Sequence, residues 1–501
     1  MATEIELCLS LWPEAAPLLV DEVALAYGVA PRTRELVSVY YDTPDLLLAR
    51  RRMGLRLRRA GEQWIQTVKF GQMSDDGLSA RRELEHVTQG QTLELQHIDD
   101  PEVQAFLCGS DVAPRLAPVF VTRITRTLWN VADAQGGQVE LALDVGVIEA
   151  QGCTEPVHEL EIELKQGALP LVFDVAQRLA QRVALLPQPC SKAERGYRLC
   201  VHKAVQPSGA QAPVLPPDAT GHALAQALVG ECLRHLHANL PWAADGAQPE
   251  FLHQSRVALR RLRSAWALLD LQAQGPLREW LDGLRRLGTA LGAARDWQVL
   301  AQTVHTAPVL QGPACPESIA ALRTAVDQAA TQARLDVQQQ LQQPATGQVL
   351  LQGLRWLHLD GGQALSGLAA RKVGDRALTR AHRAVARLAR LWPTLDVPAR
   401  HTLRKRTKRL RYEVEFLAAL YPRRRVATYR AVLQRLQEEL GILNDAAVAD
   451  TLLSTLYPRH PDVAYAAGLL CGWSRCQSDA AVHRLATWCR DRMPPSRFWS
   501  R

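Results

Sequence analysis

The spacing of apolar residues changes once along this chain of 501 residues, and the change separates two kinds of structure. Up to about residue 203, short runs alternate apolar and polar residues, as in residues 4–9, 54–58 and 139–144. A period of two is typical of antiparallel strands that bury one face. From about residue 218 onward, apolar residues recur at spacings of three and four, which is typical of amphipathic helices.

A segment rich in Pro, Gly and Ala separates the two halves. It spans residues 204–217, contains four prolines and has no apolar period, as expected of a linker. The chain is also too long for one ordinary hydrophobic core. We therefore predict a multidomain α+β protein, with an antiparallel β domain at residues 1–203 and an all-α domain at residues 218–501.

Composition excludes several classes of protein. Hydrophobic residues make up 47% of the chain and charged residues 22%, which excludes global disorder and a polytopic membrane protein. The ten cysteines are scattered singly, with no CxxC spacing, so we expect reduced thiols. The N-terminus has no basic stretch of the kind that begins a secretory signal, and no run approaches the ~20 apolar residues of a spanning helix. These features predict a cytoplasmic protein that does not associate with membranes.

The strands of the first half carry charges of one sign at alternate positions. Residues two apart share a strand face at about 7 Å, so paired carboxylates repel unless cations lie between them. Basic pairs on other strands supply part of that charge, and a divalent metal supplies the rest. The groups are the pair Glu4 and Glu6, the pair Arg56 and Arg58, and the triplet Glu159, Glu161 and Glu163. This mixture suits a phosphate chain held by Arg and Lys with Mg²⁺ or Mn²⁺, inside a barrel whose polar faces line a tunnel.

An ordered series of motifs over residues 1 to 200 resembles the CYTH domain of the triphosphate tunnel metalloenzyme family. The motifs are Glu4-x-Glu6, Gly54-Leu-Arg56-Leu-Arg58, Thr67-Val-Lys69, Arg126-Thr-Leu-Trp129, Glu140-x-Ala-x-Asp144, Glu159-Leu-Glu161-Ile-Glu163 and Ser191-Lys192-Ala-Glu-Arg195-Gly-Tyr197. The resemblance implies an eight-stranded antiparallel tunnel barrel with flanking helices. It also implies hydrolysis of inorganic or thiamine triphosphate, RNA triphosphatase activity or ATP cyclisation, with Mg²⁺ or Mn²⁺.

Site roles follow from this resemblance residue by residue. It implies that Glu4, Glu6, Glu161 and Glu163 are catalytic and hold metal, and that Glu159 and Asp144 contribute to the metal site. It further implies that five basic side chains bind the phosphates of the substrate. These are Arg56, Arg58, Lys69, Arg126 and Lys192.

Position 8 departs from the family pattern, because Cys8 stands where the N-terminal ExExK motif has lysine. A thiol supplies no standing positive charge. Loss of one charge-assisted contact to substrate costs on the order of 1.5 to 3 kcal/mol, or one to two decades of affinity or rate. Cys8 is therefore compatible either with a weakened enzyme or with a protein that has lost catalysis.

The basic second half contains an internal repeat. His253-Gln-Ser-Arg256 with Arg260 and Arg263 recurs, 148 residues later, as His401-Thr-Leu-Arg404 with Lys408 and Arg411. An LGxx(R/N)DxxV element at residues 291–299 recurs at residues 440–448. The chain therefore contains a duplicated helical unit, with halves at about 218–365 and 366–501.

Helical geometry places each repeated set of basic residues on one face. At 100° per residue, each set lies within a stripe about 80° wide and about 15 Å long. A run of charge is often only a solvated face, but such a face normally mixes in Glu at i±4, and the histidine-led stripe is repeated. Two rows of cations suit a polyanion. Asp296 and Asp445 are interpreted as structural residues that pair with basic side chains.

The helical half resembles the CHAD domain, the conserved histidine alpha-helical domain, over about residues 218 to 501. This resemblance rests on the duplicated HxxRVxxRRLR-like and LGxxRDxxV elements. It implies two pseudo-symmetric four-helix bundles, inorganic polyphosphate bound in a basic groove, and association with polyphosphate granules. The polyphosphate-binding residues would be those of the two stripes, His253, Arg256, Arg260, Arg263, His401, Arg404, Lys408 and Arg411.

The sequence thus predicts a cytoplasmic inorganic triphosphatase that acts on tripolyphosphate and binds long-chain polyphosphate. One alternative is a non-catalytic polyphosphate-binding protein of the granules, in which the tunnel only senses its ligand. A second alternative is that the basic half binds nucleic acid. Aromatic residues are only 6% of the chain, which argues against a single-strand binding surface built on stacking.

Overall fold

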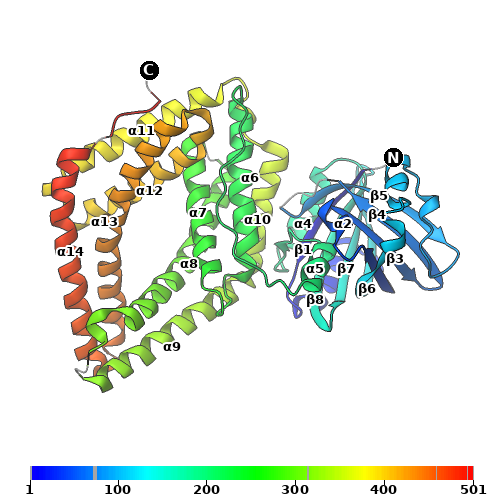
Figure 1. Cartoon of the computed structure of the whole chain (residues 1–501), viewed down its shortest axis with the longest axis horizontal. Coiled ribbons are helices and arrows are strands. Elements are labelled where there is room, and N and C mark those ends of the chain that lie inside the picture. The colour runs from blue at the N-terminus through cyan, green and yellow to red at the C-terminus, as the bar shows by residue number, and fades with distance from the viewer. Residues whose placement is uncertain are drawn as a thin grey trace. The chain divides into compact units, whose positions relative to one another are not determined.

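A computed structural model describes residues 3–71, 76–272, 274–312, 315–458, 460–493 and 495–499. The chain forms two compact units, shown in Figure 1. The barrel unit comprises Met1–Gln206 with Leu341–Leu359, and the helical unit comprises Pro207–Gln340 with Asp360–Arg501. The segment 341–359, which falls inside the predicted helical domain of residues 218–501, groups with the barrel by its contacts.

Strands of the barrel unit form one closed antiparallel sheet. They are β1 (Thr3–Ser10), β2 (Arg32–Asp42), β3 (Met53–Ala60), β4 (Gln63–Phe70), β5 (Leu78–Thr88), β6 (Ala117–Ala132), β7 (Gln138–Ala150) and β8 (Cys153–Gln166). Neighbours run in the order β5-β4-β3-β2-β6-β7-β8-β1, and β1 also pairs with β5, which closes the ring. A short strand, β9 (Leu186–Pro187), pairs with β1 outside this ring. The predicted eight-stranded antiparallel barrel is confirmed.

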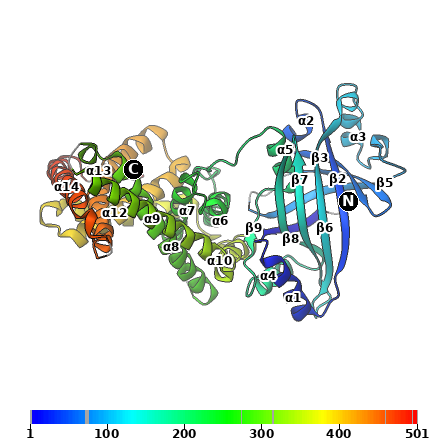
Figure 2. The ribbon, with the colours of Figure 1, turned by 90° about the horizontal axis from the view of Figure 1, so that it is seen from below.

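Apolar positions of the strands face outward and are covered by helices. In β1, Leu7 and Leu9 are fully buried, and they alternate with the polar residues Glu6, Cys8 and Ser10. Helix α4 (Pro170–Leu179) packs against β8, and α1 (Ala15–Tyr27) packs against α4, as Figure 2 shows. The short helices α2 (Leu47–Arg50) and α3 (Pro101–Leu107) cover apolar residues of β3 and β4. The polar strand faces are thereby left to line the barrel interior.

Helix α5 (Lys192–Cys200) packs into one end of the barrel. Its Tyr197 contacts an apolar cluster that includes Phe120 and Ile124 of β6. At Gly196, a Cβ atom would lie 2.3 Å from the Phe120 ring, so the helix approaches the strand at a distance that only glycine permits. This close packing fixes the position of the first residue of α5, Lys192.

The segment at 341–359 belongs with the barrel through specific contacts. Helix α10 (Pro344–Arg355) packs against α4 and β9. The Gln177 side-chain amide donates a hydrogen bond to Gln352 at 2.6 Å. His358 Nε2 lies 2.8 Å from Asp76 Oδ2, next to the start of β5.

The helical unit consists of two successive sets of four helices among the described residues. The first set is α6 (Gly221–Asn239), α7 (Glu250–Leu269), α8 (Pro276–Thr306) and α9 (Pro316–Leu341). The second set is α11 (Ala370–Arg390), α12 (Val397–Phe416), α13 (Arg423–Leu456) and α14 (Ala464–Arg492). The repeated basic stripes lie on α7 and α12, which pack together.

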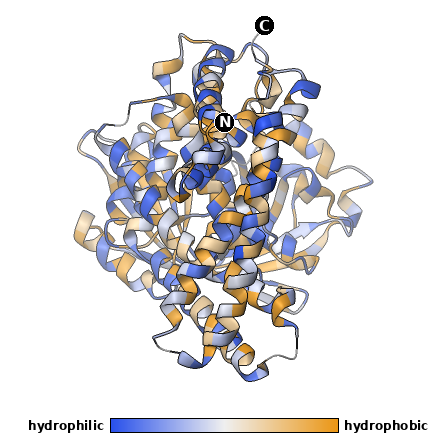
Figure 3. Ribbon diagram, turned by 90° about the vertical axis from the view of Figure 1, so that its left-hand side faces the viewer, coloured by the Kyte–Doolittle hydropathy of each residue, from blue (hydrophilic) through white to orange (hydrophobic). Residues whose placement is uncertain are grey.

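The long helices of the two sets meet in a shared core. Buried residues of α8 and α9 pack with those of α13 and α14, and Figure 1 shows these four helices converging. Figure 3 shows apolar and polar residues interleaved along the helices, as expected of amphipathic packing. Within the described ranges, none of the helices has the length and apolar character required to cross a bilayer.

Candidate functional site

A cavity of about 800 Å³ lies inside the barrel and is lined by charged side chains from most of its strands. Ten of the eleven tunnel residues predicted from the sequence line it. They are Glu4, Glu6, Arg56, Arg58, Lys69, Arg126, Glu159, Glu161, Glu163 and Lys192. The eleventh, Asp144, is fully buried on the same face of β7, where it pairs with Arg126 and Lys192.

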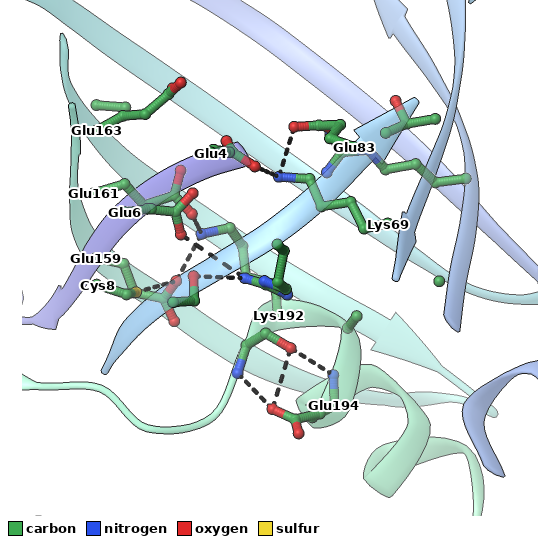
Figure 4. Close-up of a pocket in the computed structure, with 18 of the residues that line it drawn as sticks. Glu4, Glu6, Cys8, Lys69, Glu83, Glu159, Glu161, Glu163, Lys192 and Glu194 are labelled. Carbon is green, nitrogen blue, oxygen red and sulfur yellow. Dashed lines mark hydrogen bonds and ion pairs between the residues drawn. The ribbon is translucent and has the colours of Figure 1, made fainter. Parts of the chain in front are cut away.

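Acidic residues of β1 and β5 converge on Lys69 in one part of the cavity, as Figure 4 shows. Lys69 Nζ lies 2.9 Å from Glu4 Oε2 and 3.0 Å from Glu83 Oε2. Burial and the negative charges of Glu6 and Glu83 nevertheless raise the pKa of Glu4 to about 7, against the opposing effect of Lys69. Burial, and next the charge of Glu161, also raise the pKa of Glu6. Both carboxylates are therefore harder to ionise than an exposed glutamate, and a cation bound beside them would favour their charged form.

Lys192 is at the centre of a second cluster. Its Nζ lies 2.6 Å from Glu159, 2.7 Å from Glu161 and 3.0 Å from Asp144. Arg126 binds the same carboxylates, at 2.6 Å from both Asp144 and Glu161. Although burial favours its neutral form, these carboxylates hold the pKa of Lys192 well above its usual value.

The position of Lys192 is fixed by the start of α5. Ser191 Oγ accepts a hydrogen bond from the Glu194 backbone N–H at 3.2 Å, and the Glu194 carboxylate accepts one from the Ser191 N–H at 2.9 Å. This reciprocal cap holds the first turn of the helix against the cavity. The lysine therefore extends from a rigid helix terminus.

Cys8 lies in the cavity wall beside this second cluster. Its Sγ is 3.8 Å from Glu159 Oε2, to which it donates a weak hydrogen bond. Burial, and next the charge of Glu159, raise the pKa of the thiol well above its usual value, so it remains neutral. Arg195 also pairs with Glu159. Three cations, Arg126, Lys192 and Arg195, thus face three carboxylates without a lysine at position 8.

Arginines of β3 line another part of the wall. Arg56 Nη2 lies 3.2 Å from Glu83 Oε1. Arg58 donates a hydrogen bond to Ser38 Oγ at 3.2 Å and, among the described residues, has no carboxylate within ion-pair distance. Burial and the positive charges of Arg56 and Arg126 lower the pKa of Arg58 to about 9. A bound anion would relieve this repulsion.

Glu163 completes the predicted acidic set. Its Oε2 lies 2.6 Å from Lys165 Nζ, which is half-exposed. Glu6 and Glu163 are direct partners in the pairing of β1 with β8, so their side chains share one face. Carboxylate oxygens are the ligands that Mg²⁺ and Mn²⁺ prefer, so the carboxylates gathered around Glu4 and Glu6 fit a hard divalent cation.

Strand β5 lines the cavity with four residues that belong to none of the predicted motifs, Ser79, Arg81, Glu83 and Glu85. Arg81 lies 4.0 Å from Glu6, and Glu83 bridges Lys69 and Arg56. Both belong to the alternating run Arg81-x-Glu83-x-Glu85, which has the same period as the motifs that were assigned. The alternation therefore indicates that these residues share one face of the strand. The pairing of β5 with β1, which closes the barrel and brings that face into the cavity, was not visible in the sequence.

In the helical unit, five cations from three helices form a cluster. Arg256 and Arg260 lie on α7, Arg295 on α8, and Arg404 and Lys408 on α12. Burial, followed by the charges of Arg404 and Arg260, lowers the pKa of Lys408 to about 7. The Nε atoms of Arg260 and Arg404 are buried and have no hydrogen-bond partner among the described residues. We call these five residues the cationic cluster.

The remaining predicted residues lie at the margins of this cluster or have other neighbours. His253 is half-buried and lies near Arg295, whereas His401 is exposed. Arg263 is exposed, and the charge near it is that of Arg285. The donors of Arg411 are used by Glu415 and Gln437, each at 2.7 Å.

An equivalent ion pair occurs in each of the two repeats. Arg256 Nη1 lies 3.0 Å from Asp296 Oδ1, and Arg404 Nη2 lies 3.9 Å from Asp445 Oδ1. Both aspartates belong to the repeated LGxx(R/N)DxxV element. They orient the first arginine of each stripe, which agrees with their interpretation as structural residues.

Known families match both parts of the chain. The CYTH domain family matches residues 2–197, and the CHAD domain family matches residues 227–454. A crystal structure of the CHAD domain from the plant Ricinus communis superposes with a TM-score of 0.52 at 32% sequence identity. That match covers 57% of this chain and 98% of the plant domain.

Two curated proteins are similar to parts of the chain. An inorganic triphosphatase of Haemophilus influenzae is 30% identical over 200 residues, which are 40% of this chain and 55% of that protein. An uncharacterized protein of Mycobacterium tuberculosis is 29% identical over 283 residues, which are 54% of this chain and 52% of that protein. The chain therefore spans about half the length of the curated relatives it matches.

Proposed function

The chain combines a CYTH domain with a CHAD domain, and we propose that it is a metal-dependent inorganic triphosphatase whose helical unit binds inorganic polyphosphate. The observation that carries the proposal is that one cavity is lined both by clustered carboxylates and by clustered cations. Burial, more than any neighbouring charge, raises the pKa of Glu4 to about 7 and lowers that of Arg58 to about 9. A phosphate chain with a bound cation would favour the charged form of both groups.

The metal in this proposal is Mg²⁺ or Mn²⁺, held by Glu4, Glu6, Glu161 and Glu163, with Glu159 and Asp144 contributing. When bound, the cation neutralises phosphoryl oxygens and so makes the terminal phosphorus easier to attack. The donor set supports this assignment because all of its members are carboxylates.

The chain's own residues position the substrate. Arg56, Arg58 and Lys69 extend from β3 and β4, and Arg126 and Lys192 extend from β6 and α5, so phosphate oxygens are bound from two sides. This arrangement holds the phosphate chain in line for attack by a water that the glutamates orient. The products are pyrophosphate and phosphate, and no covalent enzyme intermediate is required.

The first test is release of phosphate from tripolyphosphate with Mg²⁺ or Mn²⁺ present. We expect turnover by the native chain and loss of turnover when EDTA removes the metal. We expect Cys8→Lys to change the rate by less than about 10-fold, because three cations already balance the carboxylates near position 8.

The same assay separates catalysis from binding alone. Hydrolysis by Cys8→Lys but not by the native chain would show that the cysteine marks lost catalysis. The protein would then be a polyphosphate-binding factor. No release above the background of a Glu6→Ala variant, with either metal, would contradict the enzyme proposal outright.

Polyphosphate binding by the helical unit is supported by the cationic cluster. Residues 204–501 carry a net charge of +15, and the cluster gathers part of it where guanidinium donors lack partners. A flexible chain with one negative charge per phosphate fits such a surface. Arg263 and Arg411 have a smaller part in this proposal than Arg260, Arg404 and Lys408.

Binding of long-chain polyphosphate is expected to weaken as the pH rises. Lys408 has a pKa of about 7 in the free protein, and a bound polyanion raises it, so binding takes up a proton above pH 7. The affinity should fall by about 20-fold between pH 6.5 and 8.5. Titration calorimetry at the two pH values measures this. A Lys408→Arg variant, which stays charged, should show a nearly flat profile, and an equally steep profile in that variant would contradict the assignment.

Competition distinguishes polyphosphate from nucleic acid as the partner. At equal phosphate concentration, RNA is expected not to displace long-chain polyphosphate from the full chain. Displacement by RNA would favour a nucleic-acid-binding helical unit instead. A cytoplasmic location at polyphosphate granules is part of the same proposal, and a fluorescent fusion that stays diffuse in cells with visible granules would contradict it.

A further inference from the structure

A group of two histidines and one glutamate lies on the outside of the barrel, apart from the tunnel. His86 is on β5, Glu94 is in the following loop, and His97 ends a short 3-10 turn (Leu95–His97). His86 Nε2 lies 3.1 Å and His97 Nδ1 lies 2.9 Å from the same oxygen, Glu94 Oε2. Three donor atoms from separate places in the sequence therefore converge on one point.

The glutamate is held in place by groups that do not belong to the triad. Its other oxygen, Oε1, accepts a hydrogen bond from the Gln89 N–H at 2.8 Å. The buried side chain of Gln66, on β4, accepts from the Glu94 N–H at 2.7 Å and donates to the Glu94 carbonyl at 3.2 Å. These hydrogen bonds hold Glu94 so that its second oxygen, Oε2, points toward the two imidazoles.

The strand register keeps this group separate from the catalytic cavity. Gln66 and His86 are direct partners in the pairing of β4 with β5, whereas the neighbouring pair, Thr67 and Glu85, lines the cavity. Successive residues of a strand point to opposite faces. A ligand bound at His86 therefore lies outside the barrel wall.

Two of the three donor separations are close to those of a tetrahedral zinc site, and all three lie within 4.8 Å. At metal–ligand distances of about 2.0–2.1 Å, tetrahedral ligands lie about 3.3 Å apart. The observed separations of 2.9 and 3.1 Å to Glu94 Oε2 would need to widen by only a few tenths of an ångström. In the metal-bound form, the proton of each imidazole resides on the nitrogen that faces away.

We propose that His86, Glu94 and His97 bind a single Zn²⁺ ion on the outer surface of the barrel. Imidazole donors favour Zn²⁺ over Mg²⁺, which prefers an all-oxygen site. The side chain of His97 is 49% exposed, which gives the ion an entry path and leaves its fourth position to water. The ion fastens the loop after β5 to the barrel and leaves the tunnel metal site unaffected.

Zinc binding to the full chain tests the proposal. The protein, freed of metal with EDTA and then of EDTA, is titrated with Zn²⁺ in excess Mg²⁺, which occupies the tunnel carboxylates, and binding is followed by calorimetry. We expect one equivalent bound with micromolar or tighter affinity. His97→Gln and His86→Ala should each weaken it by at least about 10-fold, while His158→Ala, at another barrel histidine, and Glu6→Gln, in the tunnel, should not.

A second measurement addresses the ligands directly. Co²⁺ bound in place of Zn²⁺ should give the visible absorption of a four- or five-coordinate site, and His97→Gln should remove it. Because His97 is half-exposed, that variant keeps the fold, which circular dichroism verifies. Equal zinc affinity in the native chain and in both histidine variants, or no stoichiometric zinc in the native chain, overturns the proposal.

Discussion

A Glu6→Gln variant is expected to lose about 10³-fold of its tripolyphosphate hydrolysis and yet to unfold at the same or a higher temperature than the native chain. Glu6 is 7% exposed, and burial together with the charge of Glu161 raises its pKa. An acid with a raised pKa in the folded state destabilises the fold once it is ionised at neutral pH. Glutamine keeps the shape and removes that cost, but it cannot supply the charge that the metal requires.

A matched control should respond in the opposite way. Glu155 of β8 lies 2.7 Å from both Arg195 and Arg198 and does not line the cavity. Burial raises its pKa, but the Arg198 hydrogen bond and the Arg195 charge prevail and lower it. The ionised carboxylate therefore stabilises the fold above the usual pKa of a glutamate. Glu155→Gln should lower the free energy of unfolding by about 1–3 kcal/mol and retain most activity at 25 °C.

Phosphate release and thermal unfolding, measured on both variants, show whether Glu6 serves catalysis or stability. If Glu6→Gln keeps more than a tenth of the native rate, Glu6 is not part of the metal site. If it instead loses stability as Glu155→Gln does, its role is structural. Residues that serve function commonly reduce the stability of the fold. We therefore expect the change in stability to have opposite signs in the two variants, with no loss for Glu6→Gln and a loss for Glu155→Gln.

Much of the barrel could be predicted because the alternation of apolar and polar residues is visible within each strand by itself. Glu4 and Glu6 alternate with Ile5 and Leu7, and one pair of positions is enough to assign the two faces of β1. The all-helical character of the second half follows equally from local spacing. The contact of α10 with the barrel could not be predicted, because it depends on surfaces of α4 and β9 that are distant in the sequence.

The candidate site shows a similar limit. Alternation indicates that Arg126 and Glu161 face inward, but only the pairing of β6 with β7 and of β7 with β8 brings them to 2.6 Å. In the helical unit, residue spacing alone treats Arg411 as equivalent to Arg404. Glu415, one turn further along α12, pairs with Arg411, and this partner lies beyond the repeated motif. Spacing predicts which residues share a face, whereas their partners depend on tertiary packing.

The paired change Arg260→Gln and Arg404→Gln is expected to lower the affinity for long-chain polyphosphate by about 10²-fold or more at physiological salt. Both guanidinium groups are partly buried, and each has an Nε without a partner among the described residues. These Nε atoms are themselves covered, so the terminal Nη atoms of the same two guanidinium groups are the donors that a phosphate chain would meet, and the double change removes two charge-assisted contacts. The dependence of affinity on salt should also become shallower, by about one unit of logarithmic slope per lost contact.

A charge-matched variant separates the cationic cluster from the general charge of the helical unit. Arg423→Gln with Arg424→Gln removes the same two charges from the exposed start of α13, and we expect it to change the affinity by less than about 3-fold at physiological salt. Titration calorimetry with polyphosphate of one chain length measures both variants. If the two double variants weaken binding equally, the net charge of +15 attracts the polyanion without a defined site, and the cationic cluster is not the binding surface. If only the Arg260 and Arg404 pair matters, binding depends on the cationic cluster formed by α7, α8 and α12.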